Sequence, residues 1–228
     1  MTLRPVGEPV DPKPAPRPGP VTLKGRHGRL ERLNAAKHGS GLWEAARGQD
    51  HIWTYLPDGP FADFESFAKW LEAVERNEVR YHYAVIDRNE RVVGTMSLME
   101  IRPAMRVIEV GYIVYTPVMQ RTPLATEAQY LLMRYAFEDL GYRRYEWKCD
   151  SLNAPSRRAA SRFGFVFEGI FRQHMITKAR NRDTAWYSII DKEWPARKAS
   201  FERWLAPDNF APDGSQKQSL SAMNGAPE

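Results

Sequence analysis

Three observations predict an α+β fold with three layers, in which helices cover both faces of a mixed, mostly antiparallel sheet of about six to seven strands. Alternating apolar and polar residues run through three consecutive segments between Tyr81 and Tyr115, as in neighbouring antiparallel strands. A long amphipathic segment, 123–140, separates the third of these from the next strand candidate, so those two strands are expected to be parallel. A shorter helical pattern and two further strand patterns follow.

The beginning of the chain is expected to contribute an arm, one strand and two helices. Residues 1–20 are rich in proline and are predicted to form a flexible, extended arm. A short strand is expected at 21–24 and a helix with glycine interruptions over 33–48. In the second helix, Asp63 is a suitable N-cap, and apolar residues at helical spacing form one stripe. These are Phe64, Phe67, Trp70, Leu71 and Val74.

The remaining elements follow from turn residues and from changes of hydrophobic period. Gly141 is a natural C-cap for the long helix before it. In chain order, the expected elements are two strands within 81–101, a strand at 107–115, a helix at 123–140, a strand at 144–149, a helix at 153–163, strands at 165–175 and 183–194, and a short helix ending near 205.

Composition favours a single packed domain. Of the 228 residues, 43% are hydrophobic, which is enough for one core. The domain is expected to span 21–206, and the polar, small-residue-rich segment 211–228 is predicted to be disordered. The oligomeric state is left open, with a homodimer as one option.

The same composition argues against several classes of partner. Cys149 is the single cysteine, which excludes an internal disulfide and fits the reducing cytoplasm, the expected location. No histidines and cysteines are grouped at metal-ligand spacing, so no metal is expected. No run reaches about 18 apolar residues, so no membrane partner is expected. The net charge of +5 is modest, and no basic-aromatic motif indicates nucleic-acid binding.

A strand, a tight loop and a helix follow one another between Val107 and Asp139, and this layout suits phosphate binding. Main-chain N–H groups converge at a helix N-terminus, and the helix dipole adds to their attraction for an anion. A strand, polar loop and helix are also a common arrangement that binds no phosphate, so from the residues alone an ordinary polar loop is the simpler interpretation.

The loop residues resemble a known motif. The sequence Gln120-Arg121-Thr122-Pro123-Leu124-Ala125, followed by Thr126-Glu127-Ala128, resembles the pyrophosphate-binding loop of the GCN5-related N-acetyltransferases (GNATs), in the ribosomal-protein N-terminal acetyltransferase (RimJ/RimL)-like branch. The resemblance covers about Val21 to Trp194 and implies a GNAT-like fold and acetyl-CoA as cosubstrate. It implies cofactor contacts from Gln120, Arg121, Thr122, Leu124, Ala125 and Thr126.

Pro123 departs from the family pattern, which has glycine at this position. Proline has no N–H but suits the first turn of a helix. Three outcomes are therefore open: the missing donor is not used, Arg121 and Thr122 compensate for it, or cofactor binding is weak.

A second stretch of resemblance begins at Asn153. The family pattern implies that Asn153 holds the pantetheine arm of the cofactor and that Ser156 protonates the leaving thiolate. Arg158, on the same predicted helix, is expected to meet a cofactor phosphate. Asn153 and Ser156 are also ordinary residues for a helix N-terminus, and this alternative stays open.

The strand before the loop is expected to carry the chemistry. The family pattern implies that the backbone of Ile113, Val114 and Tyr115 pairs with the pantetheine arm, with Val114 as the inward N–H donor. Glu109 is a charge within an apolar strand, and burial would raise its pKa into the range of a general base. The alternatives are a salt bridge to Arg102 or Arg106, or an exposed edge position. Strand alternation places Glu109 on one face with Val107, Gly111, Ile113 and Tyr115.

Candidate acceptor-binding residues are less specific. Trp53 and Tyr55 lie in an aromatic, turn-rich segment and are expected either to stack on a substrate or to pack over the sheet. His82 and His174 are strand histidines that could approach the same cleft, or serve a structural role. Asp150 could hold a cationic substrate or cap the turn after its strand.

The resemblance and these residues together imply an N-acetyltransferase, an acyltransferase that moves an acetyl group to a primary amine by direct attack. The acceptor is expected to be a protein N-terminus or a small molecule. The alternative, motivated by Pro123, is a non-catalytic acyl-CoA-binding or regulatory module of the same fold.

Overall fold

The computed structural model describes residues 4–225 and contains one sheet with the strand order β1-β2-β3-β4-β5-β6-β8-β7. All neighbouring strands are antiparallel except β5 and β6, which are parallel. The strands are β1 (Leu23–Lys24), β2 (Gly28–Arg32), β3 (Tyr81–Asp87), β4 (Val92–Arg102), β5 (Val107–Tyr115), β6 (Arg144–Asp150), β7 (Val166–Thr177) and β8 (Arg180–Ile190). The α-helices are α1 (Ala35–Ala46), α2 (Phe64–Glu75), α3 (Pro123–Arg134), α4 (Ala154–Arg162), α5 (Trp194–Leu205) and α6 (Leu220–Met223).

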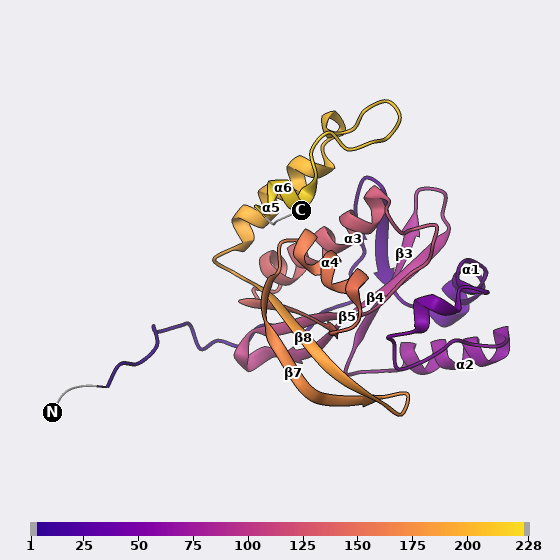
Figure 1. The fold of residues 1–228 in the computed structure, drawn as a ribbon, viewed down its shortest axis with the longest axis horizontal. Helices are drawn as coiled ribbons and strands as arrows, with labels where there is room; N and C mark the ends of the chain where they lie inside the picture. The colour runs from indigo at the N-terminus through magenta and orange to yellow at the C-terminus, as the bar shows by residue number, and fades with distance from the viewer. Residues whose placement is uncertain (1–3, 226–228) are drawn as a thin grey trace.

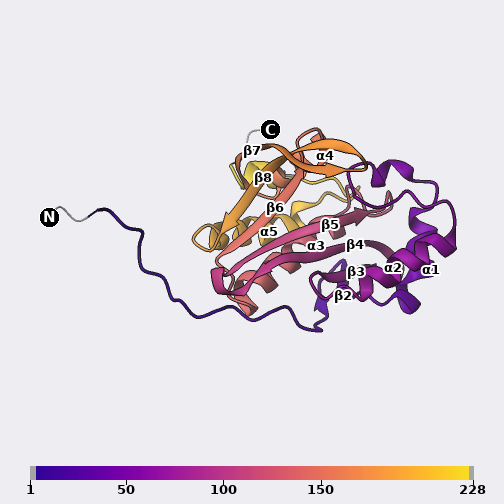
Figure 2. The same cartoon turned by 90° about the horizontal axis from the view of Figure 1, so that it is seen from below.

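Helices cover both faces of this sheet, so the predicted fold class is confirmed (Figures 1 and 2). Helices α3 and α4 pack on one face, and α5 packs against α3. Helices α1 and α2 lie on the opposite face, over the β2–β5 side of the sheet. The two faces therefore have separate cores.

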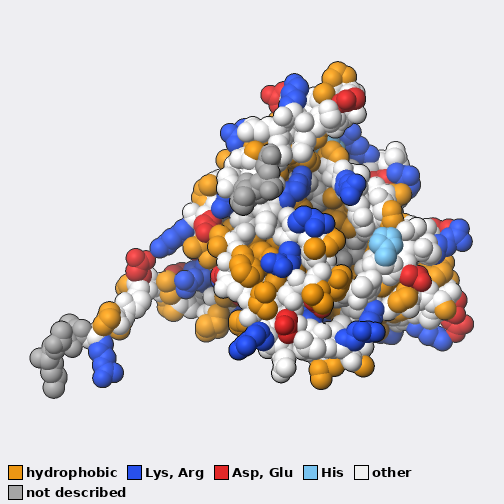
Figure 3. Space-filling model, in the orientation of Figure 1, with side chains coloured by type: hydrophobic (Ala, Val, Ile, Leu, Met, Phe, Trp, Pro, Cys, Tyr) orange, Lys and Arg blue, Asp and Glu red, His pale blue; other side chains and the backbone are white. Residues whose placement is uncertain are grey.

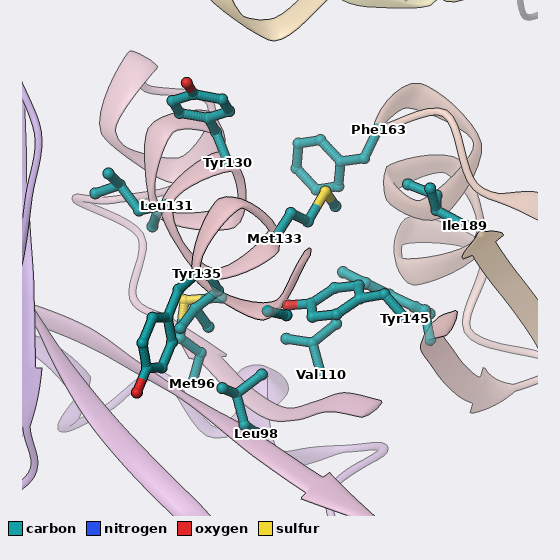
Figure 4. Close-up of a cluster of buried hydrophobic side chains, with 14 of the residues drawn as sticks. Met96, Leu98, Val110, Tyr130, Leu131, Met133, Tyr135, Tyr145, Phe163 and Ile189 are labelled. Atoms are coloured by element: carbon teal, nitrogen blue, oxygen red, sulfur yellow. The ribbon is translucent and has the colours of Figure 1, made fainter. Parts of the chain in front are cut away.

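The larger core lies under α3. Side chains from this helix and the turn that follows it, including Met133 and Tyr135, meet Met96, Leu98 and Val110 of the sheet (Figure 4). Leu124, Ala128, Leu131 and Leu132 of this helix are all buried. The α-helix itself ends at Arg134, and a π-helical turn continues the chain over Tyr135–Asp139.

Strand β2 is absent from the sequence-based prediction. Its five residues, GRLER, bury one side chain, Leu30, while the other four are half-buried. A strand that presents a single apolar residue to the core has no alternation to detect. The sheet therefore has eight strands in the described residues rather than the predicted six to seven.

Strands β5 and β6 pair over only part of their length. The register joins Val107–Val110 to Arg144–Trp147, and beyond these residues the two strands are not paired with each other. The sheet is continuous on both outer sides, because β5 pairs with β4 up to Tyr115 and β6 pairs with β8 up to Asp150. A wedge between two parallel strands therefore opens toward their C-terminal ends.

A β-bulge interrupts the alternation of β5. Tyr112 has a φ of 49°, and the register with β4 shifts at this point, so that an extra residue enters β5. As a result, Ile113 and Tyr115 pack toward the α3 core, on the face that Ile108 and Val110 also occupy. The prediction that Glu109, Ile113 and Tyr115 share one face is wrong. Beyond the extra residue of the bulge, each side chain points to the opposite face from the one expected.

The C-terminal segment is ordered as far as it is described, so the predicted disorder is wrong for residues 211–225. The Trp204 indole donates to Gln216 Oε1 at 2.7 Å, and the Asn209 amide binds the main chain at Trp204 and Gln218. Leu220 of α6 is completely buried. Residues 226–228 of this predicted tail lie outside the described residues.

The N-terminal arm is attached at its second half. Ala15 N–H donates to Pro103 O at 3.1 Å, and Gly19 N–H donates to the Tyr135 hydroxyl at 2.9 Å. The Tyr142 hydroxyl donates to Pro16 O at 3.1 Å. The predicted flexible arm is therefore wrong for residues 15–20, which lie against the body of the protein. Residues 4–14 run outward (Figure 1), although Glu8 Oε2 is 3.2 Å from Lys192 Nζ, and residues 1–3 are not described.

Strand β7 forms an edge of the sheet and is rich in exposed apolar side chains, which appear as orange groups over this strand in Figure 3. Phe171 is 53% exposed and Ile176 is 83% exposed. No helix of residues 4–225 has the length and apolar character needed to cross a membrane.

Replacing Leu220 with alanine tests whether the C-terminal segment is part of the folded unit. Because Leu220 is fully buried, Leu220→Ala is expected to lower the free energy of unfolding by about 2–4 kcal/mol, measured by urea denaturation. Lys217→Ala, at an exposed position of the same segment, is the control. Equal stability of the two variants would mean that this segment does not pack on the domain.

Candidate active site

The N-terminus of α3 presents unsatisfied main-chain donors beside the wedge. Within residues 4–225, the N–H groups of Arg121 and Leu124 have no hydrogen-bond partner. Arg121 has a φ of 61°, a left-handed conformation that turns its N–H away from the preceding turn. Two free donors at the positive end of a helix form a suitable site for an anion such as pyrophosphate.

Pro123 occupies the first position of α3, where its missing N–H costs no hydrogen bond. Thr122 is the N-cap, and its hydroxyl accepts from Ala125 N–H at 3.3 Å. The Gln120 amide donates to Tyr115 O at 2.8 Å and so ties the loop to the end of β5. The loop therefore keeps donors on both sides of the proline.

Arg162 adds a positive charge at the same place. Its guanidinium donates to Thr126 Oγ1 at 2.9 Å and lies 4.8 Å from the Trp204 ring centroid. Burial lowers the pKa of Arg162. The nearby Glu127 carboxylate is held instead by the N–H groups of Arg26 and His27, at 2.7 Å each. Within residues 4–225 no carboxylate forms an ion pair with this guanidinium, so its charge is available to an anionic ligand beside the helix N-terminus.

Arg162 was not among the predicted cofactor-binding residues, because a basic residue on a short helix is usually solvated. Its burial comes from α5 and α6, which contact it from distant parts of the sequence: Asn224 of the C-terminal segment donates to Arg162 O at 3.0 Å. Arg158, the predicted phosphate ligand, is exposed on the same helix.

Asn153 and Ser156 lie at the start of α4, facing β6. The Asn153 side chain accepts from Ser156 N–H at 3.1 Å, which is the N-cap geometry. The Ser156 hydroxyl accepts from the Trp147 indole at 3.0 Å, so its own proton is free for another acceptor. Trp147 is the last residue of β6 that pairs with β5. Ser156 is thus positioned at the apex of the wedge, on the α4 face.

The main chain of β5 lines the other side of the wedge. The carbonyl oxygen of Val114 faces β4, since it lies 2.7 Å from the position of a Cβ on Gly94. The N–H and C=O of one strand residue point to the same side, so the N–H of Val114 also faces β4. The prediction that Val114 is the inward donor is therefore wrong, and its neighbours Ile113 and Tyr115 present their N–H groups to the wedge.

Glu109 lies at the apex on the opposite face, buried and paired with a lysine. Its Oε2 atom is 2.6 Å from Lys148 Nζ, and the carboxylate is 3% exposed. Burial raises the pKa of Glu109 to about 7, and the nearby Lys148 ammonium partly opposes this rise. Glu109 is the residue before the last paired residue of β5, and Lys148 is the first unpaired residue of β6.

The ion pair replaces both alternatives that the sequence suggested for Glu109. Arg102 pairs with Glu146, and Arg106 donates to Gly141 O at 2.9 Å. The sequence did not indicate Lys148 as the partner of Glu109, because Lys148 lies 39 positions away in the chain. Its strand, β6, becomes a neighbour of β5 only through the α3 crossover.

His82 shares this face but is uncharged. It is 2% exposed, and its Nε2 atom has no partner in the described residues. Burial and the nearby Arg80 and Arg32 lower the pKa of His82 to about 3. Its ring is 5.8 Å from that of Tyr112, at the bulge of β5. A neutral imidazole here could accept a hydrogen bond from a ligand.

The segment around η1 (Asp50–Trp53) bridges the open end of this face. The Tyr55 hydroxyl donates to Leu152 O at 3.1 Å, and Lys178 Nζ donates to Trp53 O at 2.9 Å. The Trp53 ring itself is buried among Phe61, Phe67 and Trp70, so it packs rather than stacks on a ligand. Tyr55 remains at the mouth.

His174 and Asp150 have structural partners at the far side of the site. The ring of His174 lies against Phe171 and Trp186, and its Nδ1 is 3.0 Å from Thr184 Oγ1. The Asp150 carboxylate accepts from Leu152 N–H at 2.9 Å, the turn-capping alternative.

The comparisons with known proteins agree with this architecture. A family model described as an acetyltransferase (GNAT) domain matches residues 30–166. The chain therefore belongs to the GNAT acetyltransferase family, which confirms the resemblance and makes acetyl transfer the class of its activity.

Several related structures and sequences are known. The crystal structure of a GCN5-related N-acetyltransferase from Brucella melitensis is 49% identical, covers 93% of this chain and 98% of its own, and has a TM-score of 0.91. A GNAT-family structure from Chromobacterium violaceum is 38% identical, covers 86% and 100%, and has a TM-score of 0.79. The uncharacterized N-acetyltransferase YnaD of Bacillus subtilis is 24% identical over 67% of this chain and 89% of its own. YdaF of Bacillus subtilis, whose name proposes a ribosomal N-acetyltransferase, is 30% identical over 46% of this chain and 57% of its own.

The raised pKa of Glu109 predicts a pH-dependent stability. The folded protein holds this proton more tightly than the unfolded chain, so the contribution of Glu109 to stability is fully present below about pH 4.5 and is lost as the pH rises through about 7. Between pH 5 and pH 8, wild-type stability should drop by roughly 2–3 kcal/mol relative to Glu109→Gln in urea unfolding. Glu65→Gln, at an exposed site on α2, is the control. Parallel stability curves for wild type and Glu109→Gln would show an ordinary carboxylate.

Proposed function

We propose that this protein is an acetyl-CoA-dependent N-acetyltransferase that transfers the acetyl group directly to a primary amine. The single observation that carries the proposal is the buried Glu109 carboxylate at the apex of a wedge whose opposite side faces free helix N–H groups. The acceptor amine is that of a small molecule or of a protein N-terminus.

The residues at the wedge fit acetyl-CoA, whose thioester is the acetyl donor. The N–H groups of Arg121 and Leu124 and the guanidinium of Arg162, which Thr126 positions, would hold its pyrophosphate. Asn153 and the main chain of Ile113 and Tyr115 would hold the pantetheine arm. Arg158, on the solvent side of α4, would approach an outer phosphate. No three metal-ligating side chains gather within residues 4–225.

Two side chains would transfer protons: one would take a proton from the amine, and the other would give a proton to the leaving sulfur. An amine must lose a proton to attack, and Glu109 has a pKa of about 7, which suits a general base near neutral pH. The outward N–H groups of β5 would stabilise the oxyanion at the attacked carbonyl. The free Ser156 hydroxyl would donate a proton to the leaving sulfur. His82 and Tyr55 would contact the acceptor.

Glu109→Gln tests the role of the carboxylate. Turnover, measured as release of free CoA thiol, is expected to fall about 100-fold or more because general base catalysis contributes 10²–10⁴-fold. The rise of wild-type activity with pH near 7 should disappear as well, while calorimetric titration shows acetyl-CoA affinity within about threefold of wild type. Unchanged turnover at every pH would exclude Glu109 from the mechanism.

Arg162→Met tests the anion site. Loss of a charge-assisted contact to a phosphate is expected to weaken acetyl-CoA binding about tenfold, or about 1.4 kcal/mol, in calorimetric titration. Arg203→Met, at an exposed position of α5, is the matched control and should bind as wild type does. A wild-type protein that binds acetyl-CoA but releases no thiol with any amine would support the non-catalytic alternative.

A further inference from the structure

The ion pair of Glu109 and Lys148 restricts what can bind at the acceptor end of the wedge. Lys148 Nζ is 2.6 Å from Glu109 Oε2 and 4.2 Å from the Trp186 ring centroid. A carboxylate and an aromatic face are the two groups that best hold an ammonium ion. The place where an acceptor amine would meet its base is therefore already occupied by an ammonium ion of the protein.

The carboxylates around this pair differ in how many cationic partners they have. Glu109 is faced by Lys148 and Glu146 from β6 and by Glu100 from β4. Glu146 is already engaged by Arg102 and Arg144. The side chain of Lys148 is 14% exposed, and among residues 4–225 only Glu109 lies within ion-pair distance of it. In the described part of the chain, no second carboxylate could therefore replace Glu109 as the partner of Lys148.

A simple cationic amine would therefore bind at a high cost. Its ammonium group would take the Glu109 carboxylate and leave the largely desolvated Lys148 ammonium without a counter-charge. Breaking a buried pair by removing one partner is strongly destabilising, because the remaining charge stays desolvated. An acceptor that brings its own carboxylate would avoid this cost, since each charge of the pair then gains a new partner.

We propose that the acceptor is a zwitterionic amine of the α-amino-acid class, whose amine faces Glu109 and whose carboxylate binds Lys148. This inference rests on the proposed function. In an α-amino acid one carbon separates the amine from the carboxylate group, so both can contact an ion pair whose atoms are 2.6 Å apart. The Lys148 ammonium thus acts as the specificity-determining residue.

A surface hollow lies near the pair. A hollow of about 760 Å³ is lined by Phe171, Gln173 and His174, among others. The Phe171 and His174 rings pack on Trp186, with centroids 4.7 and 5.8 Å from it, so the hollow opens beside the indole that Lys148 covers. Arg172 and Asp183 both line this hollow, so it presents one charge of each sign, as a zwitterion does.

The transfer step is balanced with this acceptor. The ammonium gives one proton to Glu109, the neutral nitrogen forms a bond to the acetyl carbon, and the carbon–sulfur bond breaks. The nitrogen then loses a second proton to water, and the sulfur takes a proton from Ser156, which water restores. The product is an N-acetyl amino acid, which has lost its positive charge and therefore its attraction to Glu109.

The test compares matched acceptors on the full-length protein with acetyl-CoA. Phenylalanine and leucine are paired with their decarboxylated amines, phenethylamine and isoamylamine, and kcat/KM is measured by thiol release. The amino acid of at least one pair is expected to be about 100-fold better, which corresponds to about 2.7 kcal/mol. A decarboxylated amine, spermidine or an N-terminal peptide that equals or exceeds both amino acids would overturn the proposal.

Variants of Lys148 test whether this residue causes the preference for amino acids over their decarboxylated amines. Lys148→Met is expected to reduce the preference to about threefold or less, mainly by improving the decarboxylated amines, while Lys148→Arg keeps most of it. Lys192→Met, at an exposed lysine, is the control. A preference unchanged in Lys148→Met would also overturn the proposal, and acetyl-CoA titration confirms that each variant is folded.

If the wild type binds acetyl-CoA but releases no thiol with any amine, the proposed function fails, and the zwitterion proposal fails with it. Turnover of other amines without turnover of amino acids overturns only the zwitterion proposal.

Discussion

The separation of β5 from β6 is the constraint on which the site depends. Two parallel strands pair over four residues and then diverge, while each keeps its antiparallel neighbour on the outer side. The bulge at Tyr112 adds a residue to β5 and increases its bend. Main-chain groups that would otherwise bond across the sheet are left unpaired, and an extended ligand can use them in place of a strand.

The divergence also divides the site between two faces with different chemistry. On the α3 and α4 face, the free N–H groups near Pro123, together with Arg162, are suited to phosphate. On the opposite face, Glu109 and Lys148 form a buried ion pair near the uncharged His82. A donor held on one face and an acceptor on the other can meet only at the apex. The buried charges of each face therefore act on separate partners.

The C-terminal segment extends the family domain, which the family comparison matches only to residue 166. The half-buried Arg162, at the end of α4, packs against Trp204 of α5, and Asn224, just after α6, donates to its main-chain oxygen. This packing turns a surface arginine into a fixed cation beside α3. A segment outside the common core thus contributes to the candidate cofactor site.

The sequence by itself determined the order of most elements, the crossover that makes β5 and β6 parallel, and the family, because hydrophobic period, caps and loop motifs are local signals. The sequence also indicated Glu109 as a candidate, since a carboxylate within an apolar strand pattern can be recognised without the structure. Only the tertiary structure decided the partner of Glu109, the orientation of the β5 amides and the burial of Arg162. Each of these depends on a neighbour distant in sequence, or on a one-residue bulge. The bulge reverses the direction in which the later side chains and N–H groups of β5 point.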